Sequence, residues 1–290
     1  DVGVTITNGA WLEELLSRLR EPEAIPAPEL PESFHAALRP YQRTGFTWLH
    51  YMGSLGFGAC LADDMGLGKT VQVLGYLERL RGDKPSARVL LVAPASLVSN
   101  WTREAARFAP ELEPLILHGR SSASLEELLE KHPAFLTITT YGMAARIKGL
   151  QDIVWECVIL DEAQPIKNPL TKQTKALKKL SAHMRVAMTG TPVENDLTNL
   201  WSLFDFLNKG LLGSSQAFKT FCKGLDERPE GYARLRAMVA PFLLRRLKTD
   251  KRIIADLPEK LEMVEHIALS KKQAVLYRKA VADMERRLED

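Results

Sequence analysis

A run of acidic, glycine, lysine and threonine residues at 63–70 has the composition of a phosphate-binding site. It reads Asp-Asp-Met-Gly-Leu-Gly-Lys-Thr and lies between an apolar run and a segment with roughly helical spacing. Backbone N–H groups freed by Gly66 and Gly68 can surround anionic oxygens at the start of a helix. Lys69 adds a positive charge, and the Thr70 hydroxyl can bind magnesium. The run therefore predicts a strand, a phosphate-binding loop and a helix.

Asp63 departs from the usual pattern of such loops. The pattern G-x-x-x-x-G-K-[ST] would place glycine at this position. Taken alone, the run could also be a chance turn that contains glycine and lysine. Motifs elsewhere in the chain are needed to distinguish a phosphate-binding loop from a chance turn.

Two adjacent acids, Asp161 and Glu162, follow the apolar run 158–160. Acids at the end of a buried strand are costly unless a nearby charge satisfies them, and a magnesium nucleotide would do so. Asp161 would hold the magnesium through its bound water, and Glu162 would orient and deprotonate the attacking water. The alternative is that the acids simply start a loop and cap a helix. The presence of the glycine-lysine-threonine loop at 63–70 makes this alternative much weaker.

Hydroxyl and amide groups follow three further apolar runs. Thr189 and Thr191 flank Gly190, so their hydroxyls could hydrogen-bond the acids of the neighbouring strand and sense bound nucleotide; an ordinary turn is the alternative. Side chains at two other strand ends could hold a nucleic-acid backbone without reading bases, namely Ser96, Asn100, Trp101 and Thr140. Simple capping of a helix is the alternative for Ser96.

The elements that must position these residues alternate between short apolar runs and amphipathic segments. Strands are predicted at 58–62, 88–93, 114–118, 135–139, 156–160 and 184–188, and helices at 69–81, 97–108, 124–131, 141–148, 171–181 and 197–208. Near-continuous Val, Ile and Leu strands alternating with helices indicate a parallel sheet covered on both faces. The predicted fold is a doubly wound α/β domain, in which ligands bind at the carboxyl ends of the strands.

The flanking segments are predicted to be mostly helical. Amphipathic spacing indicates helices near Trp11–Leu19, from Pro40 to about Leu55, at 215–223 and at 231–240, with a proline-rich connector at 21–33. Ser270 and Gln273 have the spacing of a capping box before a last amphipathic helix.

Composition sets broad limits on the function. The chain has 290 residues, 46% hydrophobic and 26% charged, and a formal net charge of +3, which are ordinary globular values that do not by themselves indicate a nucleic-acid partner. The three cysteines lack the close spacing of a zinc site or a disulfide framework.

Neither an apolar run of membrane-spanning length nor a signal peptide is present, so we expect an intracellular protein with no membrane partner, cytoplasmic or in the nucleoid or nucleus. Because it opens on Asp1 and ends inside a helical pattern, we expect a fragment of a longer protein.

Five motifs in order resemble those of the SWI/SNF-type ATPases, which are helicase-like DNA translocases of superfamily 2. They are Leu38-Arg39-Pro40-Tyr41-Gln42, Asp64-Met65-Gly66-Leu67-Gly68-Lys69-Thr70, Val92-Ala93-Pro94, Asp161-Glu162-Ala163-Gln164 and Thr189-Gly190-Thr191-Pro192-Val193-Glu194-Asn195. Leu200-Trp201-Ser202-Leu203 and Phe242-Leu243-Leu244-Arg245-Arg246 with Lys248 also match that family, in which an acid stands at the position of Asp63. The resemblance covers about residue 38 to residue 260.

The resemblance implies a RecA-like phosphate-loop lobe that binds ATP and Mg²⁺. Gln42 would contact adenine, with Arg39 and the loop residues Asp64, Met65, Gly66, Leu67, Gly68, Lys69 and Thr70 completing the nucleotide site. Lys69 would contact the β and γ phosphates, Thr70 and Asp161 the magnesium, and Glu162 would be the catalytic base. Gln164 stands where many relatives have histidine; it keeps hydrogen bonding to the hydroxyl motif but cannot titrate. Thr189, Gly190 and Thr191 would couple the site to nucleic acid, and Ser96, Asn100, Trp101, Thr140 and Lys167 would lie along double-stranded DNA.

The implied domains are an N-terminal helix with its connector (1–37), the RecA-like lobe (38–210), a helical extension (211–269) and a helix (270–290) that leads to a second RecA-like lobe. That lobe would supply arginine fingers, and a DNA-bound protein would be the target. Basic residues between 142 and 186 could face phosphates or form a solvated helix face. A second basic cluster, Arg245, Arg246, Lys248, Lys251 and Arg252, could contact DNA or the partner lobe. A nucleotide-gated module without catalysis and an RNA-stimulated ATPase remain the alternative functions.

Overall fold

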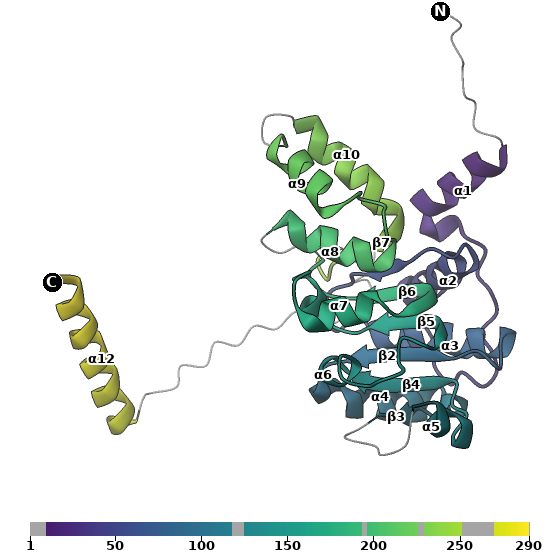
Figure 1. Cartoon of the computed structure of the whole chain (residues 1–290), viewed down its shortest axis with the longest axis horizontal. Helices are drawn as coiled ribbons and strands as arrows, with labels where there is room; N and C mark the ends of the chain where they lie inside the picture. Colours follow the sequence, from purple (N-terminus) through teal and green to yellow (C-terminus); the bar gives the residue numbers. More distant parts are fainter. Residues whose placement is uncertain (1–9, 118–124, 193–195, 226–228, 251–269, 290) are drawn as a thin grey trace, which may run out of the picture. The chain divides into compact units, whose positions relative to one another are not determined.

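The computed structural model describes residues 10–117, 125–192, 196–225, 229–250 and 270–289 (Figure 1). The chain divides into two compact units, Asp1–Ile253 and Ile254–Asp290. In the described ranges, no helix combines the length and the apolar character needed to cross a membrane.

The first unit is built on a seven-stranded sheet in the order β3-β4-β2-β5-β6-β1-β7. The strands are β1 (Ala59–Leu61), β2 (Val89–Ala93), β3 (Leu115–Ile116), β4 (Leu136–Thr140), β5 (Val154–Leu160), β6 (Ser181–Met188) and β7 (Leu243–Leu244). Neighbouring strands pair in parallel throughout the described sheet. The predicted doubly wound parallel sheet is therefore confirmed.

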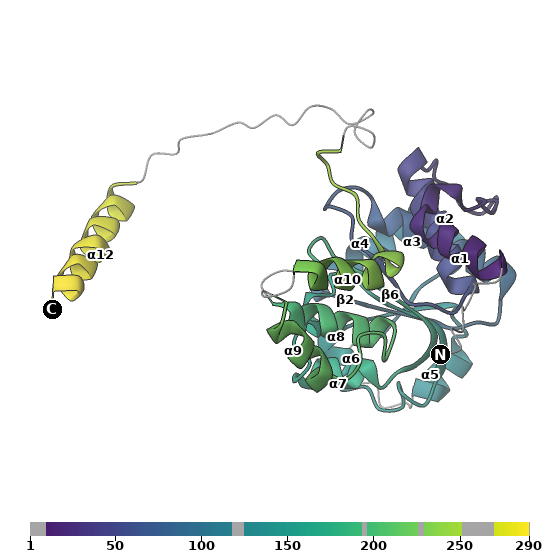
Figure 2. The ribbon, with the colours of Figure 1, turned by 90° about the horizontal axis from the view of Figure 1, so that it is seen from above.

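Alternate residues of the central strands face opposite layers, which is why the strands read as continuous apolar runs. Ala59, Leu61 and Leu91 belong to one core, whereas Cys60 and Leu90 belong to the other. The first core is closed by α1 (Ala10–Arg20), α2 (Pro40–Ser54), α3 (Lys69–Asp83) and α4 (Ala95–Phe108). The second is closed by α5 (Leu125–Lys131), α6 (Tyr141–Ala144), α7 (Lys172–Lys178) and α8 (Leu197–Leu207). Figure 2 shows the layers of α2 and α3 and of α7 and α8 on opposite sides of the strands.

Most predicted elements differ from the observed ones by one to three residues at an end: for example, the strand predicted at 114–118 is Leu115–Ile116 and the helix predicted at 171–181 is Lys172–Lys178. The helix predicted at 141–148 ends at Ala144, and β5 and β6 begin earlier than predicted, at Val154 and Ser181. The first residues of both strands include exposed positions, so the apolar pattern that predicted the strands begins later than the strands themselves. The two-residue strand β7 was not predicted, because it is too short to show a period.

A small helical layer follows the sheet, formed by α8, α9 (Ser215–Lys223) and α10 (Pro229–Val239). Phe204, Phe218 and Leu235, one from each helix, share its core. In the second unit, α12 (Lys271–Glu289) begins with the predicted capping box. Gln273 N donates to Ser270 Oγ at 3.3 Å, and Ser270 N donates to Gln273 Oε1 at 3.0 Å.

Candidate functional site

The predicted site residues meet at the carboxyl edge of the sheet because β5, β6 and β1 are neighbours in register. Leu160 pairs with Ala187, and Leu61 pairs with Met188. Backbone bonds continue beyond the strand ends: Ala163 N donates to Met188 O at 2.9 Å, and Thr189 N donates to Leu61 O at 3.2 Å. The loop at 63–70, the acid pair and the Thr-Gly-Thr turn therefore lie side by side.

The phosphate loop has a backbone that favours its glycines. Gly66 and Gly68 have φ values of +81° and +77°, in the left-handed region that side chains disfavour. A Cβ on Gly68 would lie 2.5 Å from Gln42 Nε2, so a side chain here would displace the Gln42 amide from the loop. Lys69 is buried at the first position of α3, and its Nζ donates to Asp63 O at 2.7 Å. The ammonium therefore lies inside the loop, and Thr70 follows it on the first turn of the helix.

Gln42 contacts the same loop from α2. Its Nε2 donates to Leu67 O at 3.2 Å, while its Oε1 accepts from Arg39 N at 3.0 Å at the start of the helix. One side chain thus stabilises the helix start and the phosphate loop together. Gln42 therefore lies beside the loop, and Arg39 contacts Gln42 at the start of the helix.

The acid pair has a buried member and a strained member. Asp161 is 6% exposed, and its oxygens accept from Trp101 Nε1 at 2.7 Å and from Glu162 N at 2.9 Å. Burial raises the pKa of Asp161 and Glu162 adds to the rise, whereas the Trp101 bond and Lys69 oppose it. Glu162 has a φ of +46°, which is uncommon for a residue with a side chain and is concentrated at functional sites. Such a pair is an oxygen-rich site at which a divalent cation would be stabilised.

The Thr-Gly-Thr turn joins the acids to the phosphate loop. Thr189 is fully buried and its Oγ1 accepts from Thr191 N at 3.2 Å. A Cβ on Gly190 would lie 3.7 Å from Met65 Cγ, so the turn packs against the loop. The Gln164 amide donates to Glu162 Oε2 at 3.1 Å, which places it on the acid pair.

Two residues predicted to lie along DNA are buried instead. Trp101 is 1% exposed and its indole N–H is bonded to Asp161, so it supports the acid pair. Lys167 is 4% exposed, and its Nζ donates to Thr191 O at 2.5 Å, so it holds the Thr-Gly-Thr turn. The sequence did carry a signal for Trp101, because it shares a buried helical stripe with Val98 and Ala105 on α4.

The other three nucleic-acid candidates have different environments. Ser96 is exposed near the start of α4, and it does not cap that helix, which begins after Pro94 without a side-chain bond. Asn100 is half-buried between Glu104 and Arg103. Thr140 caps α6 by accepting from Met143 N at 3.3 Å.

Arg246 was also assigned wrongly from the sequence. It was placed in a basic cluster for DNA or a partner lobe, but it is 8% exposed and ion-paired with Asp63 of the phosphate loop. The spacing of the sequence gives no signal for this pair, because 183 positions separate the two residues. Asp63 itself was the only hint, as an acid where the usual loop has glycine.

The described residues fit a magnesium nucleotide better than a metal ion alone. No cluster of three or more His, Cys, Asp or Glu side chains in the described ranges could hold a metal. A Cβ at Gly68 would fill space beside the left-handed loop, and Lys69 lies near enough to Asp161 to oppose the rise in its pKa. Phosphate oxygens would complete the ligand set that Thr70 and Asp161 begin.

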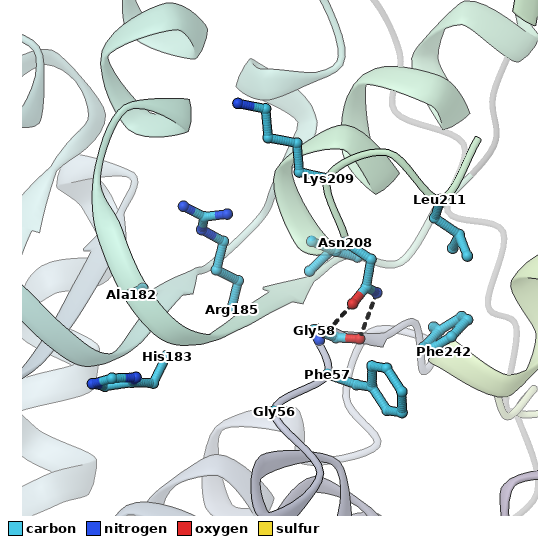
Figure 3. Close-up of a pocket in the computed structure, with 11 residues that line it drawn as sticks. Gly56, Phe57, Gly58, Ala182, His183, Arg185, Asn208, Lys209, Leu211 and Phe242 are labelled. Carbon is cyan, nitrogen blue, oxygen red and sulfur yellow. Dashed lines mark hydrogen bonds between the residues drawn. The ribbon is translucent and has the colours of Figure 1, made fainter. Parts of the chain in front are cut away.

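A cavity of about 400 Å³ lies at the opposite edge of the sheet. It is lined by residues that include Gly58, just before β1, and His183 and Arg185, within the first five residues of β6. Figure 3 shows Asn208 closing one wall, where its amide accepts from Gly58 N and donates to Gly58 O. None of the acid or phosphate-loop residues lines this cavity, so it is separate from the candidate site.

The chain is similar to known proteins over most of its length. The model of the SNF2-related domain matches residues 41–289. YwqA of Bacillus subtilis, which is named for an ATP-dependent helicase/translocase, is 41% identical over 289 residues, covering 97% of this chain and 31% of that protein. The chromatin-remodeling ATPase INO80 of Arabidopsis thaliana is 32% identical over 282 residues, covering 89% of this chain and 19% of that protein.

A solved structure is similar as well. The SWI2/SNF2 ATPase core of Sulfolobus solfataricus in complex with dsDNA has a TM-score of 0.74 and 40% identity, covering 91% of this chain and 56% of that chain. These matches confirm the predicted resemblance and the RecA-like fold. The chain spans less than a third of the length of the two curated relatives.

Proposed function

The chain belongs to the SNF2-related family of ATPases, and from that premise we propose that it is the first RecA-like lobe of an ATP-dependent double-stranded DNA translocase. The full protein would move along DNA and remodel protein–DNA complexes. The observation that carries the proposal is the gathering of Lys69, Asp161 and Glu162 at one edge of the sheet, beside a glycine loop of the required conformation.

Each residue at that edge has a defined role in this proposal. Lys69 would bind the β and γ phosphates, and Thr70 and Asp161 would hold the magnesium. Glu162 orients the attacking water and accepts its proton. Magnesium bound with ATP would neutralise part of the negative charge of the phosphates. Gln42 contacts the adenine of ATP and Arg39 completes the nucleotide site, while Thr189 and Thr191 report the state of the site to the DNA-binding surface.

The DNA-binding surface is supported by an exposed basic group. Exposed basic side chains lie on two segments whose helices, α6 and α7, pack together. Arg146 and Lys148 follow α6, and Lys172, Lys175 and Lys179 lie on α7 or at its end. Ser96 lies exposed at another strand end, which supports its place on the DNA track. The SWI2/SNF2 relative of known structure is in complex with dsDNA. Contacts of this kind would be salt-sensitive and independent of sequence.

These 290 residues are proposed to bind ATP weakly and to hydrolyse it slowly. In other phosphate-loop enzymes, arginine fingers supply about 10³ to 10⁵ in rate, and by family resemblance they lie on a second RecA-like lobe. The SWI2/SNF2 core of known structure extends well beyond the part that matches this chain. Its remaining length is consistent with such a lobe.

Steady-state phosphate release tests the proposal. We expect slow release by these 290 residues and DNA-stimulated release by a polypeptide that also carries the second lobe. In that polypeptide, Glu162→Gln should abolish turnover and keep ATP binding. Glu156→Gln is the matched control, because Glu156 lies on the same strand but pairs with Lys84 away from the site.

Three results would contradict parts of the proposal. Rapid DNA-stimulated turnover by the 290 residues alone would refute the need for a second lobe. Remodelling that survives Glu162→Gln would indicate a nucleotide-gated module without catalysis. Stronger stimulation by RNA than by duplex DNA would indicate an RNA translocase.

A further inference from the structure

Asp63 is a fully buried carboxylate at the first position of the phosphate loop. The common loop pattern has glycine there, which needs no partner. A buried carboxylate without a partner costs several kcal/mol and would also repel phosphate groups bound next to it. The loop can therefore bind a nucleotide well only if something neutralises Asp63.

Arg246 is the group that neutralises it, from the segment just after β7. Its Nε donates to Asp63 Oδ1 at 2.8 Å and its Nη2 donates to Asp63 Oδ2 at 2.5 Å, which is the two-pronged geometry that guanidinium forms with carboxylates. The backbone N of Arg246 adds a bond to Oδ1 at 3.2 Å. Arg246 thus fixes both the charge and the orientation of the carboxylate.

The pair is enclosed by side chains that leave Arg246 little freedom. Nη2 also donates to Gln72 Oε1 at 2.6 Å, and Gln72 Nε2 donates back to Asp63 Oδ2 at 3.1 Å. The guanidinium lies over the Tyr41 ring, 5.3 Å from its centroid, and Nη1 donates to Tyr41 O. A Cβ on Gly45 would lie 1.8 Å from Gln72 Oε1, so glycine at this position of α2 makes room for the network.

Backbone bonds extend the contact along the loop. Ala62 N donates to Leu244 O at 2.7 Å and Asp64 N donates to Arg246 O at 3.0 Å. Lys248 N then donates to Asp64 Oδ2 at 2.9 Å. The segment 244–248 therefore runs beside the start of the phosphate loop and holds it at three successive points.

We propose that Arg246 is a positioning residue of the nucleotide site, which sets the conformation and the charge of the phosphate loop through Asp63. This inference rests on the proposed ATP-binding function. Arg246 does not touch the phosphates; it acts through Asp63, whose backbone carbonyl accepts from Lys69. Loss of Arg246 would leave a buried negative charge next to the phosphates and would release the carbonyl that orients Lys69.

A double-mutant cycle tests the inference. The dissociation constant for ATP with Mg²⁺ is measured by titration calorimetry for the full 290-residue chain, for Arg246→Met, for Asp63→Asn and for the double variant. Arg246→Met should weaken ATP binding on the order of tenfold or more. In the Asp63→Asn background, where no charge remains to be neutralised, the same substitution should change the constant by less than about threefold.

Matched variants separate positioning from simple destabilisation. Arg245→Met removes the neighbouring arginine, which is exposed, and should leave ATP binding unchanged in the absence of DNA. Arg246→Lys keeps the positive charge but loses the two-pronged hydrogen bonding of the guanidinium, so it should weaken ATP binding in the wild-type background only. This variant also decides the test if Arg246→Met does not fold. Thermal unfolding without ATP is recorded for every variant, because a purely structural arginine would lower the melting temperature without changing the ATP affinity of the folded protein.

The possible failures are distinguishable. If the unmodified chain binds no ATP at millimolar concentration, the proposed function fails. If the chain binds ATP but folded Arg246→Met and Arg246→Lys bind it equally well, the inference about Arg246 is refuted. An equal loss in the wild-type and Asp63→Asn backgrounds refutes it too, because the effect would not pass through the carboxylate.

Discussion

Trp101→Phe should destabilise the protein in a way that depends on pH. The substitution removes the indole N–H that donates to Asp161 Oδ2 at 2.7 Å, between side chains that are 1% and 6% exposed. A hydrogen bond to a charged group contributes about 1.5 to 3 kcal/mol, and the smaller ring costs about a further 1 to 2 kcal/mol in lost packing. We expect a total loss of about 2.5 to 5 kcal/mol in the free energy of unfolding at neutral pH.

The sign of the pH dependence follows from Asp161. Burial already raises its pKa above the ordinary value, and the Trp101 bond lowers it, so Trp101→Phe should raise it further. The charge-dependent part of the loss is complete above the raised pKa of the variant. This part of the loss should shrink as pH falls from the pKa of Asp161 in the variant to its pKa in the wild-type protein. Below the wild-type pKa it vanishes, because Asp161 is then neutral in both folded proteins. Only the packing part remains at low pH.

Urea unfolding at a series of pH values measures this effect, with Trp155→Phe as the matched control. Trp155 is also fully buried, but its Nε1 donates to the neutral carbonyl of Leu150 at 3.1 Å. Its substitution should cost about 2 to 3 kcal/mol at every pH. If Trp101→Phe showed the same pH-independent loss as this control, the indole N–H would not be holding a charged Asp161.

Two further predictions concern the opposite edge of the sheet and the thiols. Asn208→Ala should lower the free energy of unfolding by about 2 to 3 kcal/mol in urea, because Gly58 N and O lose their partners, whereas ATP affinity should not change, since these groups lie away from the phosphate loop. A thiol reagent such as DTNB should label Cys222 in the native protein and all three cysteines in denaturant. Cys60 and Cys157 are fully buried, and burial raises the pKa of Cys60 to about 12 and that of Cys157 still further. Labelling of more than one thiol before unfolding would contradict the second prediction, and weaker ATP binding would contradict the first.

The sheet could be predicted from sequence because its strands are buried on both faces. Runs such as Val89–Ala93 have no polar position, and the segments between them have helical spacing, which leaves few alternative folds. Strand β7 could not be predicted in this way, since its two residues, Leu243 and Leu244, show no period. It forms because β1 has a free edge beside the end of the helical layer, and that is a property of the assembled fold.

The chemistry of the site was easier to predict than the surroundings of its residues. Gly66 and Gly68 are required by local backbone geometry and Lys69 follows them directly, so the spacing of these residues in the sequence is informative. Trp101 and Lys167 were placed on the DNA track by resemblance, and both are buried supports of the site. Burial depends on which elements pack against a residue, so a motif that identifies the residue does not determine whether its side chain faces solvent.

The hydrogen bonds of the two buried acids explain why only one of them suits magnesium. A carboxylate has about four lone-pair sites. Asp63 fills them with Arg246 Nε and N on one oxygen and Arg246 Nη2 and Gln72 Nε2 on the other, and the guanidinium balances its charge. Within the described residues, Asp161 accepts one bond on each oxygen, from neutral donors. Asp161 therefore keeps free lone pairs and accepts no bond from a cationic side chain, whereas the lone pairs of Asp63 are occupied and its charge is paired with Arg246. The sequence places acids at 63, 64 and 161 near the phosphates, and the distribution of donors among them favours Asp161 as the magnesium ligand.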